Sequence, residues 1–376
     1  MSRLRLFLLR RRPRPRSPAV KRTLGDDDLL GEILLRLPPQ PSSLPRAALV
    51  CKRWRSLASD PGFFRRHHGR NTPLLGFFTR NSSFSFVPTL EAPNLVPPGR
   101  FSLQPVDGDR FISLGCRHGL VLIFNVTPNQ LLVWDPVTGD QHRLAIPPGI
   151  AKHGEKSAIN GAVVRPAREV DHFQVVLTVG DNDDKQHRRV FACVYSSKTS
   201  LWGDLISTPP SSEVPKSGRP SLVVYSSVLA GNSLYCMLTG NVVGVLEFDL
   251  EKQSLAMIEV PVHMQEKGFF SVMRADGGGL GLLVPTDNSI QLWERRTGSD
   301  GVASWALGRT IELDKLLSLE SGQASLSVSI LGLAEENNVV FLWISGIVFM
   351  VHLESLQFKK LYETRYLCHY HPFESV

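Results

Sequence analysis

Residues 119–147 read GLVLIFNVTPNQLLVWDPVTGDQHRLAIP, and this stretch holds one complete β unit. The runs Gly119–Phe124, Leu131–Asp135 and Arg143–Pro147 are short and apolar, and turn-forming residues separate them, with Pro136–Gly139 before the last run. Short runs of this kind between Gly, Pro, Asn and Asp residues are typical of strands joined by hairpins. The stretch therefore predicts three strands, the second of which ends in an aromatic residue and an acid.

The same unit recurs along residues 69–376, which contain no long amphipathic helix pattern. The second strands, or their equivalents, carry the landmark residues Trp134, Phe248, Trp293 and His352, and the 114 residues from Trp134 to Phe248 hold two units around Tyr195. Phe248 and Trp293 lie 45 residues apart, and propeller blades repeat at roughly 40–50 residues. With Phe77–Val87 as a further, divergent strand pair, the region after His68 predicts a β-propeller of about six blades. A twisted β-sandwich is the alternative architecture.

A helical pattern precedes the β region. Asp26, Asp27 and Asp28 stand where an N-cap and first-turn acids stabilise a helix. The residues that follow form one apolar stripe of helical period, and Pro38-Pro39 ends it. The stripe consists of Leu29, Leu30, Ile33, Leu34 and Leu37. We expect a helix of about three turns here.

Two further short helices are expected after this one. Ser42-Ser43 can cap a second helix, and Asp60-Pro61 ends it and starts a third helix through Phe63 and Phe64. The second helix would share one apolar face formed by Ala47, Val50, Cys51, Trp54, Leu57 and Ala58. Three short helices bury little surface, so we expect this unit to be stabilised by a partner.

Residues 23–64 read TLGDDDLLGEILLRLPPQPSSLPRAALVCKRWRSLASDPGFF and resemble an F-box, most closely that of plant F-box proteins. The acidic cap, the Leu-Leu-x-x-Ile-Leu helix, the Leu-Pro stop, the Leu-Val-Cys-Lys-x-Trp segment and the final Asp-Pro occur in the family's order. One position departs from the pattern: this chain has Leu24-Gly25 where the family usually has Leu-Pro. The β region is similar to the kelch-like, F-box-associated propeller of the same proteins.

The resemblance implies that the helical unit docks on the Skp-type adaptor of a cullin-based ubiquitin ligase. The residues carried over from the family are Leu24, Leu29, Leu30, Ile33, Leu34, Leu37, Pro38, Leu49, Val50, Cys51, Trp54 and Leu57. About half of them should touch the adaptor. Leu24, Leu29, Pro38 and Val50 are the expected contacts, and Trp54 and Leu57 are expected to pack inside the unit.

The resulting organisation is multidomain: a basic tail (residues 1–22), a small all-α F-box of three short helices (23–68) and an all-β propeller domain (69–376). The resemblance implies a non-catalytic substrate-recognition subunit of an SCF-type ubiquitin ligase, in which the β domain recruits an unknown target protein. No catalytic residue, cofactor or metal is expected. The alternative is a propeller-type ligand-binding protein or enzyme with no ligase role.

The charge of the chain is uneven. The net charge is +7, but residues 1–22 hold nine basic residues and no acid, so the rest of the chain sums to −2. A slightly acidic body does not favour nucleic-acid binding, and no apolar run is long enough to span a membrane. The tail is a solvated basic segment, a nuclear-import signal or, as a third choice, an organelle transit peptide. Five scattered cysteines fit a reducing compartment, so we expect the cytoplasm, the nucleus or both.

Three other segments offer ligand-like residues with simpler structural explanations. Gly277–Gly281 is glycine-rich but lacks the Gly-Lys-Ser/Thr ending of a phosphate-binding loop, so we expect a hairpin turn. Cys368-His369-Tyr370-His371 has metal-ligand types but no second ligand pair, and a frayed terminus is expected. Asp181–Lys185 could hold calcium, but a solvated hairpin loop is expected.

Overall fold

The computed structural model divides the chain into two compact units, Met1–Thr72 and Pro73–Val376. The residues it describes are 26–60, 62–63, 66–67, 72–80, 84–103, 109–154, 159–165, 172–180, 189–208, 221–222, 227–239, 243–267, 270–317 and 327–374. The predicted basic tail and the Asp181–Lys185 segment lie outside these residues. Within them, no helix is long and apolar enough to cross a membrane.

The helical unit begins at the predicted acidic cap. The carboxylate of Asp26 accepts hydrogen bonds from the N–H groups of Asp28 and Leu29, at 2.9 and 3.3 Å, and helix α2 (Asp27–Leu34) follows. These bonds satisfy N–H groups that have no partner inside a helix. At the far end of the unit, the Asp60 carboxylate accepts from the N–H of Phe63 at 2.7 Å, as expected for a cap of a third short helix.

The predicted second helix is divided in two. Helix α3 (Ser43–Ala48) and helix α4 (Lys52–Ala58) are separated by a break at residues 49–51, where Cys51 has extended backbone with φ −164° and ψ 170°. Val and Cys are weak helix formers, so the break costs little local stability. It allows both helices to pack on α2 around one small core, which consists of Leu30, Leu34, Leu35, Leu44, Ala47, Ala58 and Phe63.

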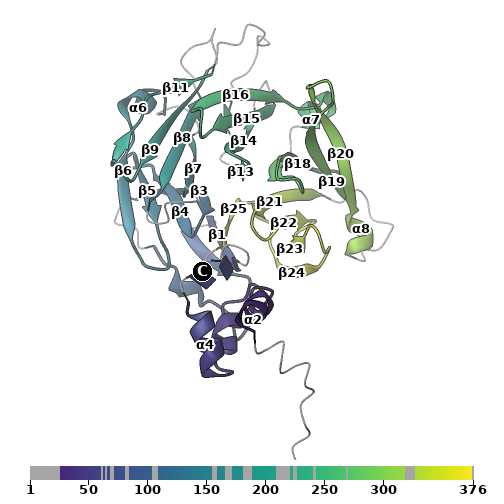
Figure 1. The fold of residues 1–376 in the computed structure, drawn as a ribbon. Helices are drawn as coiled ribbons and strands as arrows, with labels where there is room; N and C mark the ends of the chain where they lie inside the picture. The colour runs from purple at the N-terminus through teal and green to yellow at the C-terminus, as the bar shows by residue number, and fades with distance from the viewer. Residues whose placement is uncertain are drawn as a thin grey trace, which may run out of the picture. The chain divides into compact units, whose positions relative to one another are not determined.

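The larger unit is a six-bladed β-propeller, as predicted, and Figure 1 shows its sheets arranged around a central axis. The first sheet is β2 (Phe84–Pro88), β1 (Leu74–Arg80) and β25 (Tyr370–Glu374); the second is β3 (Phe111–Arg117), β4 (Leu120–Asn125), β5 (Gln130–Trp134) and β6 (Gln141–Ala145). The third is β7 (Ile159–Val164), β8 (Gln174–Gly180) and β9 (Val190–Ser196), with β10 (Leu201–Trp202) and β11 (Ile206–Ser207) both paired to β9.

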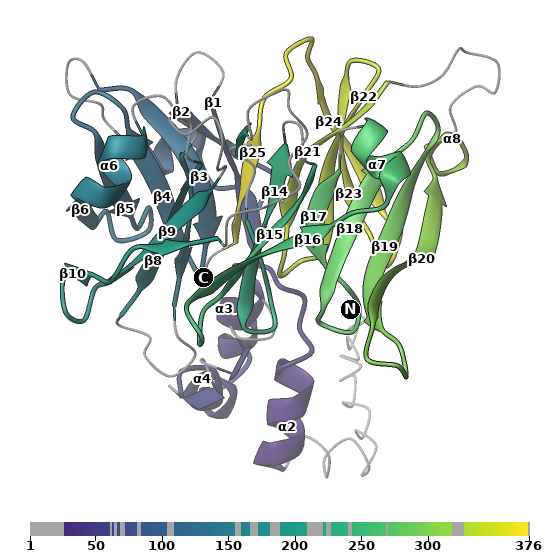
Figure 2. The same ribbon diagram turned by 90° about the horizontal axis from the view of Figure 1, so that it is seen from above.

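The remaining three sheets follow in chain order. The fourth is β14 (Ser233–Thr239), β15 (Gly244–Asp249) and β16 (Ser254–Glu259), with β12 (Ser221–Leu222) and β13 (Val228–Ala230) both paired to β14. The fifth is β17 (Ser271–Arg274), β18 (Leu280–Pro285), β19 (Ser289–Thr297) and β20 (Ala303–Glu312), and the sixth is β21 (Val328–Ala334), β22 (Val339–Ile344), β23 (Ile347–His352) and β24 (Phe358–Glu363). Short helices η1 (Pro98–Arg100), α6 (Pro148–Gly154), α7 (Val262–Lys267) and α8 (Leu313–Leu316) lie in the connections, as Figure 2 shows for α6, α7 and α8.

The expectation of a frayed C-terminus was wrong. Residues 370–374 form β25, which pairs antiparallel with β1, so the first blade combines strands from both ends of the propeller sequence. Tyr370 and Phe373 are fully buried, and the Tyr370 ring stacks on Phe77 with 4.2 Å between ring centroids. Burial of these aromatic side chains outweighs the weak strand signal of a segment that contains proline.

Hairpin turns occupy the two predicted glycine positions. The Asp135 carboxylate accepts from the N–H groups of Val137 and Thr138, at 2.9 and 3.2 Å, and Gly139 has φ +86°. The Gly277–Gly281 segment is the β17–β18 hairpin, in which Gly278 has φ +80°. Both hairpin predictions are confirmed, and the positive φ angles explain the glycines.

Candidate partner-binding surfaces

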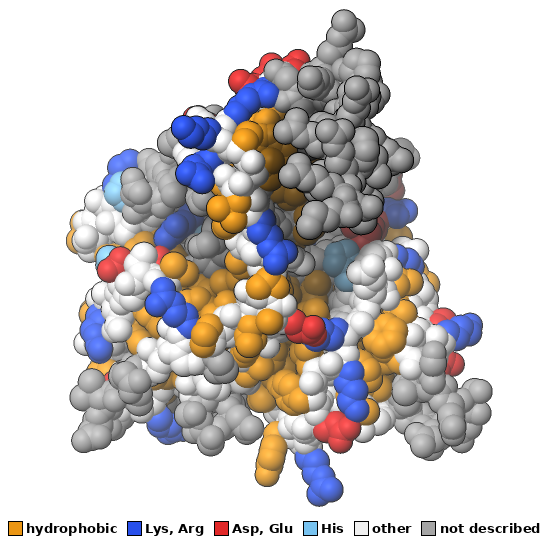
Figure 3. Space-filling model, turned by 90° about the horizontal axis from the view of Figure 1, so that it is seen from below, with side chains coloured by type: hydrophobic (Ala, Val, Ile, Leu, Met, Phe, Trp, Pro, Cys, Tyr) orange, Lys and Arg blue, Asp and Glu red, His pale blue; other side chains and the backbone are white. Residues whose placement is uncertain are grey.

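The helical unit exposes part of its apolar stripe. The exposed fractions are 48% for Leu29, 41% for Ile33, 75% for Leu49 and 62% for Val50. Leu29 and Ile33 are four residues apart on α2 and so share one face, whereas Leu49 and Val50 lie in the break between α3 and α4. We call these four residues the apolar edge; Figure 3 shows orange hydrophobic side chains among blue Lys and Arg on the helical unit.

The other carried-over residues divide by burial. Leu30 and Leu34 are fully buried in the core of the unit, and Leu37, Trp54 and Leu57 are partly buried against it. Pro38 and Cys51 are exposed, and Leu24 lies outside the described residues. The structure thus separates neighbouring leucines that the sequence pattern treats alike: Leu30 faces the core and Leu29 faces solvent.

An ion pair joins the two helices that flank the apolar edge. The Arg53 guanidinium of α4 forms an ion pair with the Asp27 carboxylate of α2, with Nη2 at 2.6 Å and Nε at 2.8 Å from Oδ1. The Asp27 side chain is well exposed, so the pair contributes little to stability, at most about 1 kcal/mol. It adds one polar contact between α4 and α2, beside the shared apolar core.

A network of charged residues joins the inner strands at one end of the propeller channel. Arg117, the last residue of β3, forms a largely buried ion pair with Glu335, which follows β21. The same guanidinium donates to the carbonyl of Ser227 at 2.6 Å, and the second Glu335 oxygen accepts from the N–H of Leu229 in β13 at 3.0 Å. Two side chains therefore connect three separate blades, and each polar atom named here has a partner.

The network extends to two more blades. Arg274 at the end of β17 donates to the carbonyl of Glu335 at 3.2 Å and to the carboxylate of Glu336 at 3.1 Å. The Glu374 carboxylate at the end of β25 accepts from the backbone N–H groups of Glu336 and Asn337 and from the Asn337 amide, at 3.3, 2.8 and 2.8 Å. Burial raises the pKa of Glu374 to about 7, although the three N–H donors act in the opposite direction.

Sequence reasoning did not find this network. The signal was present as isolated charged residues at the ends of short apolar runs, but nothing in a single run shows that residues 117, 274, 335 and 374 meet around one axis. The inner strands themselves were also missed, because β3, β7, β13, β17 and β21 lie before the runs that define each repeat.

An open cavity of about 530 Å³ lies beside this network, between the fifth and sixth blades. Residues of the β17–β18 turn, the β21–β22 turn and the β23–β24 turn line it. The lining residues are Met273, Arg274, Ala275, Asp276, Gly278, Leu333, Ala334, Glu335, Glu336, Asn338 and Glu354. We call this space the interblade cavity.

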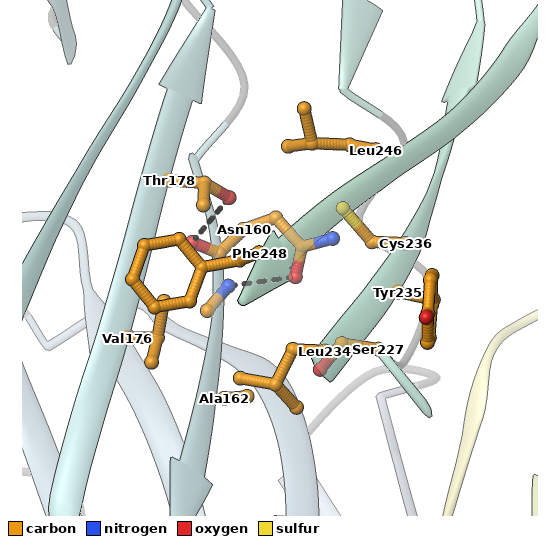
Figure 4. A pocket seen from close by; sticks show the side chains of 11 residues that line it. Asn160, Ala162, Val176, Thr178, Ser227, Leu234, Tyr235, Cys236, Leu246 and Phe248 are labelled. Carbon is orange, nitrogen blue, oxygen red and sulfur yellow. Dashed lines mark hydrogen bonds between the residues drawn. The ribbon is translucent and has the colours of Figure 1, made fainter. Parts of the chain in front are cut away.

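A second, much smaller cavity lies between the third and fourth blades. Its volume is about 20 Å³, enough for one water molecule, and its walls are mostly apolar side chains such as Val176 and Phe248 (Figure 4). Asn160 in its wall accepts from the N–H of Gly161 at 2.6 Å, and the Thr178 hydroxyl donates to the Asn160 carbonyl at 3.3 Å. This cavity is too small to hold a ligand.

The candidate metal segment near the C-terminus is occupied by structural contacts. Cys368 Sγ lies 3.2 Å from the Thr79 hydroxyl, and His369 Nδ1 lies 2.8 Å from the carbonyl of Leu331. His371 is 4% exposed inside the first blade. Across the described residues, no three His, Cys, Asp or Glu side chains are grouped so as to hold a metal ion.

Comparison with known protein families gives one match in each of the two units. The profile of the F-box-like family matches residues 27–70, and the profile described as "F-box protein AT5G49610-like, beta-propeller" matches residues 113–376. Because the second match covers more than half of the sequence, the chain belongs to the AT5G49610-like family of F-box proteins with a β-propeller. Proteins of this class are typically non-catalytic adaptors, and F-box domains as a class bind Skp-type adaptors.

Individual relatives cover smaller parts of the chain. "Putative F-box only protein 11" of Arabidopsis thaliana is 31% identical over 116 residues, 29% of this chain and 29% of that protein. "F-box/kelch-repeat protein At3g61590" of the same plant is 28% identical over 230 residues, 57% of this chain and 52% of that protein. The chain thus matches less than a third of the first relative and about half of the second.

Likeness to solved structures is low. A luciferin-regenerating enzyme aligns with 68% of this chain and 78% of its own, with a TM-score of 0.37 and 8% sequence identity. Similarity at this level carries no argument about function.

Proposed function

We propose that this protein is the substrate-recognition subunit of a cullin-based, SCF-type ubiquitin ligase. The helical unit binds a Skp-type adaptor, the adaptor connects it to a cullin, and the propeller recruits a target protein. The observation that carries the proposal is the apolar edge, Leu29, Ile33, Leu49 and Val50, exposed on a unit that matches the F-box-like family.

The apolar edge has the chemistry of a docking surface. Full burial of a Leu, Ile or Val side chain is worth about 1.5–3 kcal/mol relative to exposure, so a partner that covers these four residues gains binding energy. The small core beneath them limits the stability of the isolated unit, and the partner adds stability through linkage. Leu24, Pro38 and Cys51 complete the proposed contact set, while Leu30, Leu34, Leu37, Trp54 and Leu57 support it from inside the unit.

In this proposal the protein makes and breaks no covalent bond. Its contribution is effective concentration, because a target held on the propeller is brought close to the ubiquitin-charged enzyme. The rate of ubiquitin transfer then depends on the occupancy of two surfaces, the apolar edge and the target site on the propeller.

The test is co-purification of the full chain with a Skp-type adaptor. Leu29→Asp and Val50→Asp place a charge on the apolar edge and should reduce binding at least tenfold, because the charge must be desolvated in the interface. Ser56→Asp adds the same charge at an exposed position of α4 and is the matched control. The proposal fails if the folded wild type does not bind, or if the two edge variants bind as well as the control.

We also propose that the protein acts in the cytoplasm, the nucleus or both. The nine basic residues of the 1–22 segment support nuclear import. Fluorescent fusions of the full chain and of residues 23–376 test this. Loss of nuclear signal on deletion would support an import role for the tail, and an unchanged distribution would exclude one.

A further inference from the structure

The interblade cavity has the size of a ligand site. Its volume of about 530 Å³ lies within the range of roughly 300–1,000 Å³ that small-molecule pockets occupy. Its walls come from three hairpin turns and the strand ends beside them rather than from a single loop. The cavity can therefore hold a long side chain together with part of the backbone that carries it.

The walls of the cavity carry an excess of negative charge. Four carboxylates line it and only one cationic side chain, that of Arg274. Arg274 is paired with Glu336, and Glu335 is paired with Arg117 from outside the lining. Asp276 and Glu354 have no hydrogen-bond or ion-pair partner within the described part of the chain. Two uncompensated carboxylates from neighbouring blades thus line one space.

The walls are also held in place before any ligand arrives. In the β17–β18 turn, the N–H of Ala275 donates to the carbonyl of Gly279 and the N–H of Gly278 donates to the carbonyl of Ala275, both at 2.8 Å. In the β21–β22 turn, the backbone N–H groups of Glu336 and Asn337 donate to Glu374. A ligand would not have to order these turns, which lowers the entropic cost of binding.

We propose that the interblade cavity binds a cationic side chain, lysine or arginine, of the protein that the propeller recruits. The proposal rests on the proposed function for the identity of the partner as a recruited target, and on the cavity and its charge for the chemistry. Asp276 and Glu354 supply the counter-charges, and the Arg117–Glu335 pair holds the channel side of the wall. A negative side chain would be repelled by the same carboxylates.

The experiment measures binding of labelled peptides to the full chain by fluorescence anisotropy. The probes are Gly-Ser-Arg-Arg-Ser-Gly, the same peptide with two lysines and the same peptide with two glutamates. We expect the cationic peptides to bind, the glutamate peptide to bind at least tenfold more weakly, and the cationic peptides to lose affinity between 50 and 300 mM salt. Equal binding of all three peptides would overturn the proposal.

Variants assign the binding to the cavity. Asp276→Asn combined with Glu354→Gln removes the two free charges at nearly constant shape and should weaken the cationic peptides at least tenfold. Glu312→Gln, at an exposed position of β20, is the matched control and should bind like the wild type. Unchanged binding by the double variant would overturn the proposal.

The adaptor assay separates this inference from the proposed function. The Asp276→Asn, Glu354→Gln variant should co-purify with a Skp-type adaptor as well as the wild type does, because neither residue belongs to the helical unit. Peptide binding without adaptor binding would refute the ligase role and keep the cavity assignment. Adaptor binding without selective peptide binding would support the ligase role and refute the assignment of a cationic ligand to the cavity.

Discussion

Arg117 and Glu335, which stand 218 residues apart in sequence, form an ion pair whose side chains are 9% and 12% exposed. The pair spans blades that are not neighbours in the ring, since β3 belongs to the second sheet and β21 begins the sixth. Each partner also bonds to the backbone of the fourth blade, through Ser227 and Leu229. The pair therefore couples the geometry of alternate blades at one end of the channel.

Breaking this pair should destabilise the propeller. Arg117→Met leaves the Glu335 carboxylate buried without its counter-charge, and the free energy of unfolding should fall by about 3–5 kcal/mol. Replacing both residues, as Arg117→Met with Glu335→Leu, should recover much of that loss because no unpaired charge remains. Urea unfolding followed by tryptophan fluorescence measures both effects.

The exposed pair of Arg296 and Glu294 is the control for this prediction. Its Nη2–Oε2 distance is 2.7 Å, but the Arg296 side chain is 63% exposed, so Arg296→Met should cost less than about 1 kcal/mol. Equal effects at Arg117 and Arg296 would show that the buried pair has no special role in the channel.

Two glycines at equivalent bulges of inner strands should respond differently to alanine. A β carbon at Gly332 in β21 would overlap the carbonyl oxygen of Tyr370 in β25, whereas one at Gly115 in β3 would meet no atom within 4 Å. Gly332→Ala should therefore lower the free energy of unfolding by about 1–3 kcal/mol, with Gly115→Ala close to neutral. Thermal unfolding of the two variants checks this, and equal midpoints would contradict the close packing of β21 on β25.

Alanine substitutions at two adjacent leucines of α2 should affect different properties, stability at one position and adaptor binding at the other. Leu30→Ala removes a fully buried side chain and should destabilise the helical unit by about 2–5 kcal/mol. Leu29→Ala removes a half-exposed side chain. It should change the stability of the unit by less than about 0.5 kcal/mol but should weaken binding to the adaptor. Hydrogen exchange of the α2 amides reports stability. Rapid exchange in Leu29→Ala would contradict the assignment of Leu29 to the surface.

Acid should weaken the first blade through His371. Burial lowers the pKa of His371 to about 3, with a smaller effect from the neighbouring His369. The unfolded chain takes up this proton near pH 6.5 and the folded chain does not, so stability is full above that pH and is lost as the pH falls toward 3. At pH 5 the loss is about 2 kcal/mol.

His371→Gln isolates this effect because glutamine does not titrate. Unfolding free energies at pH 7.5 and 5.0 should differ by about 2 kcal/mol less in the variant than in the wild type. The raised pKa of Glu374 acts in the opposite sense between pH 4.5 and 7, since protonation there favours the folded state, but it is common to both proteins and cancels. Parallel pH profiles would refute a neutral, buried His371.

Much of the fold was predictable because it is encoded locally. The strand β5 and its turn at Asp135–Gly139 follow from a short apolar run and an Asp-Pro-x-Thr-Gly sequence, and the Asp26 cap of α2 follows from an acid before an apolar stripe. These signals require only neighbouring residues. The number of blades then follows from the spacing of the repeats.

The features that were missed depend on distant residues. Strand β25 has no strong pattern of its own, and its stability comes from β1 almost 300 residues earlier. The division of the second helix into α3 and α4 depends on how both helices pack on α2, and the meeting of Arg117 with Glu335 depends on the closure of the whole ring. Three-dimensional packing decides each of these, so a single sequence could not supply them.

The pairing of β1 with β25 means that the first blade can be completed only when synthesis of the chain is almost finished. Residue 374 is synthesised 294 residues after residue 80, which takes about 15–60 s at roughly 5–20 residues per second. Throughout that interval one edge of β1 has no strand beside it, while every residue of the helical unit has already been made. The nascent chain thus passes through a stage in which the helical unit is fully synthesised while one edge of β1 is unpaired, and an unpaired strand edge is prone to aggregation.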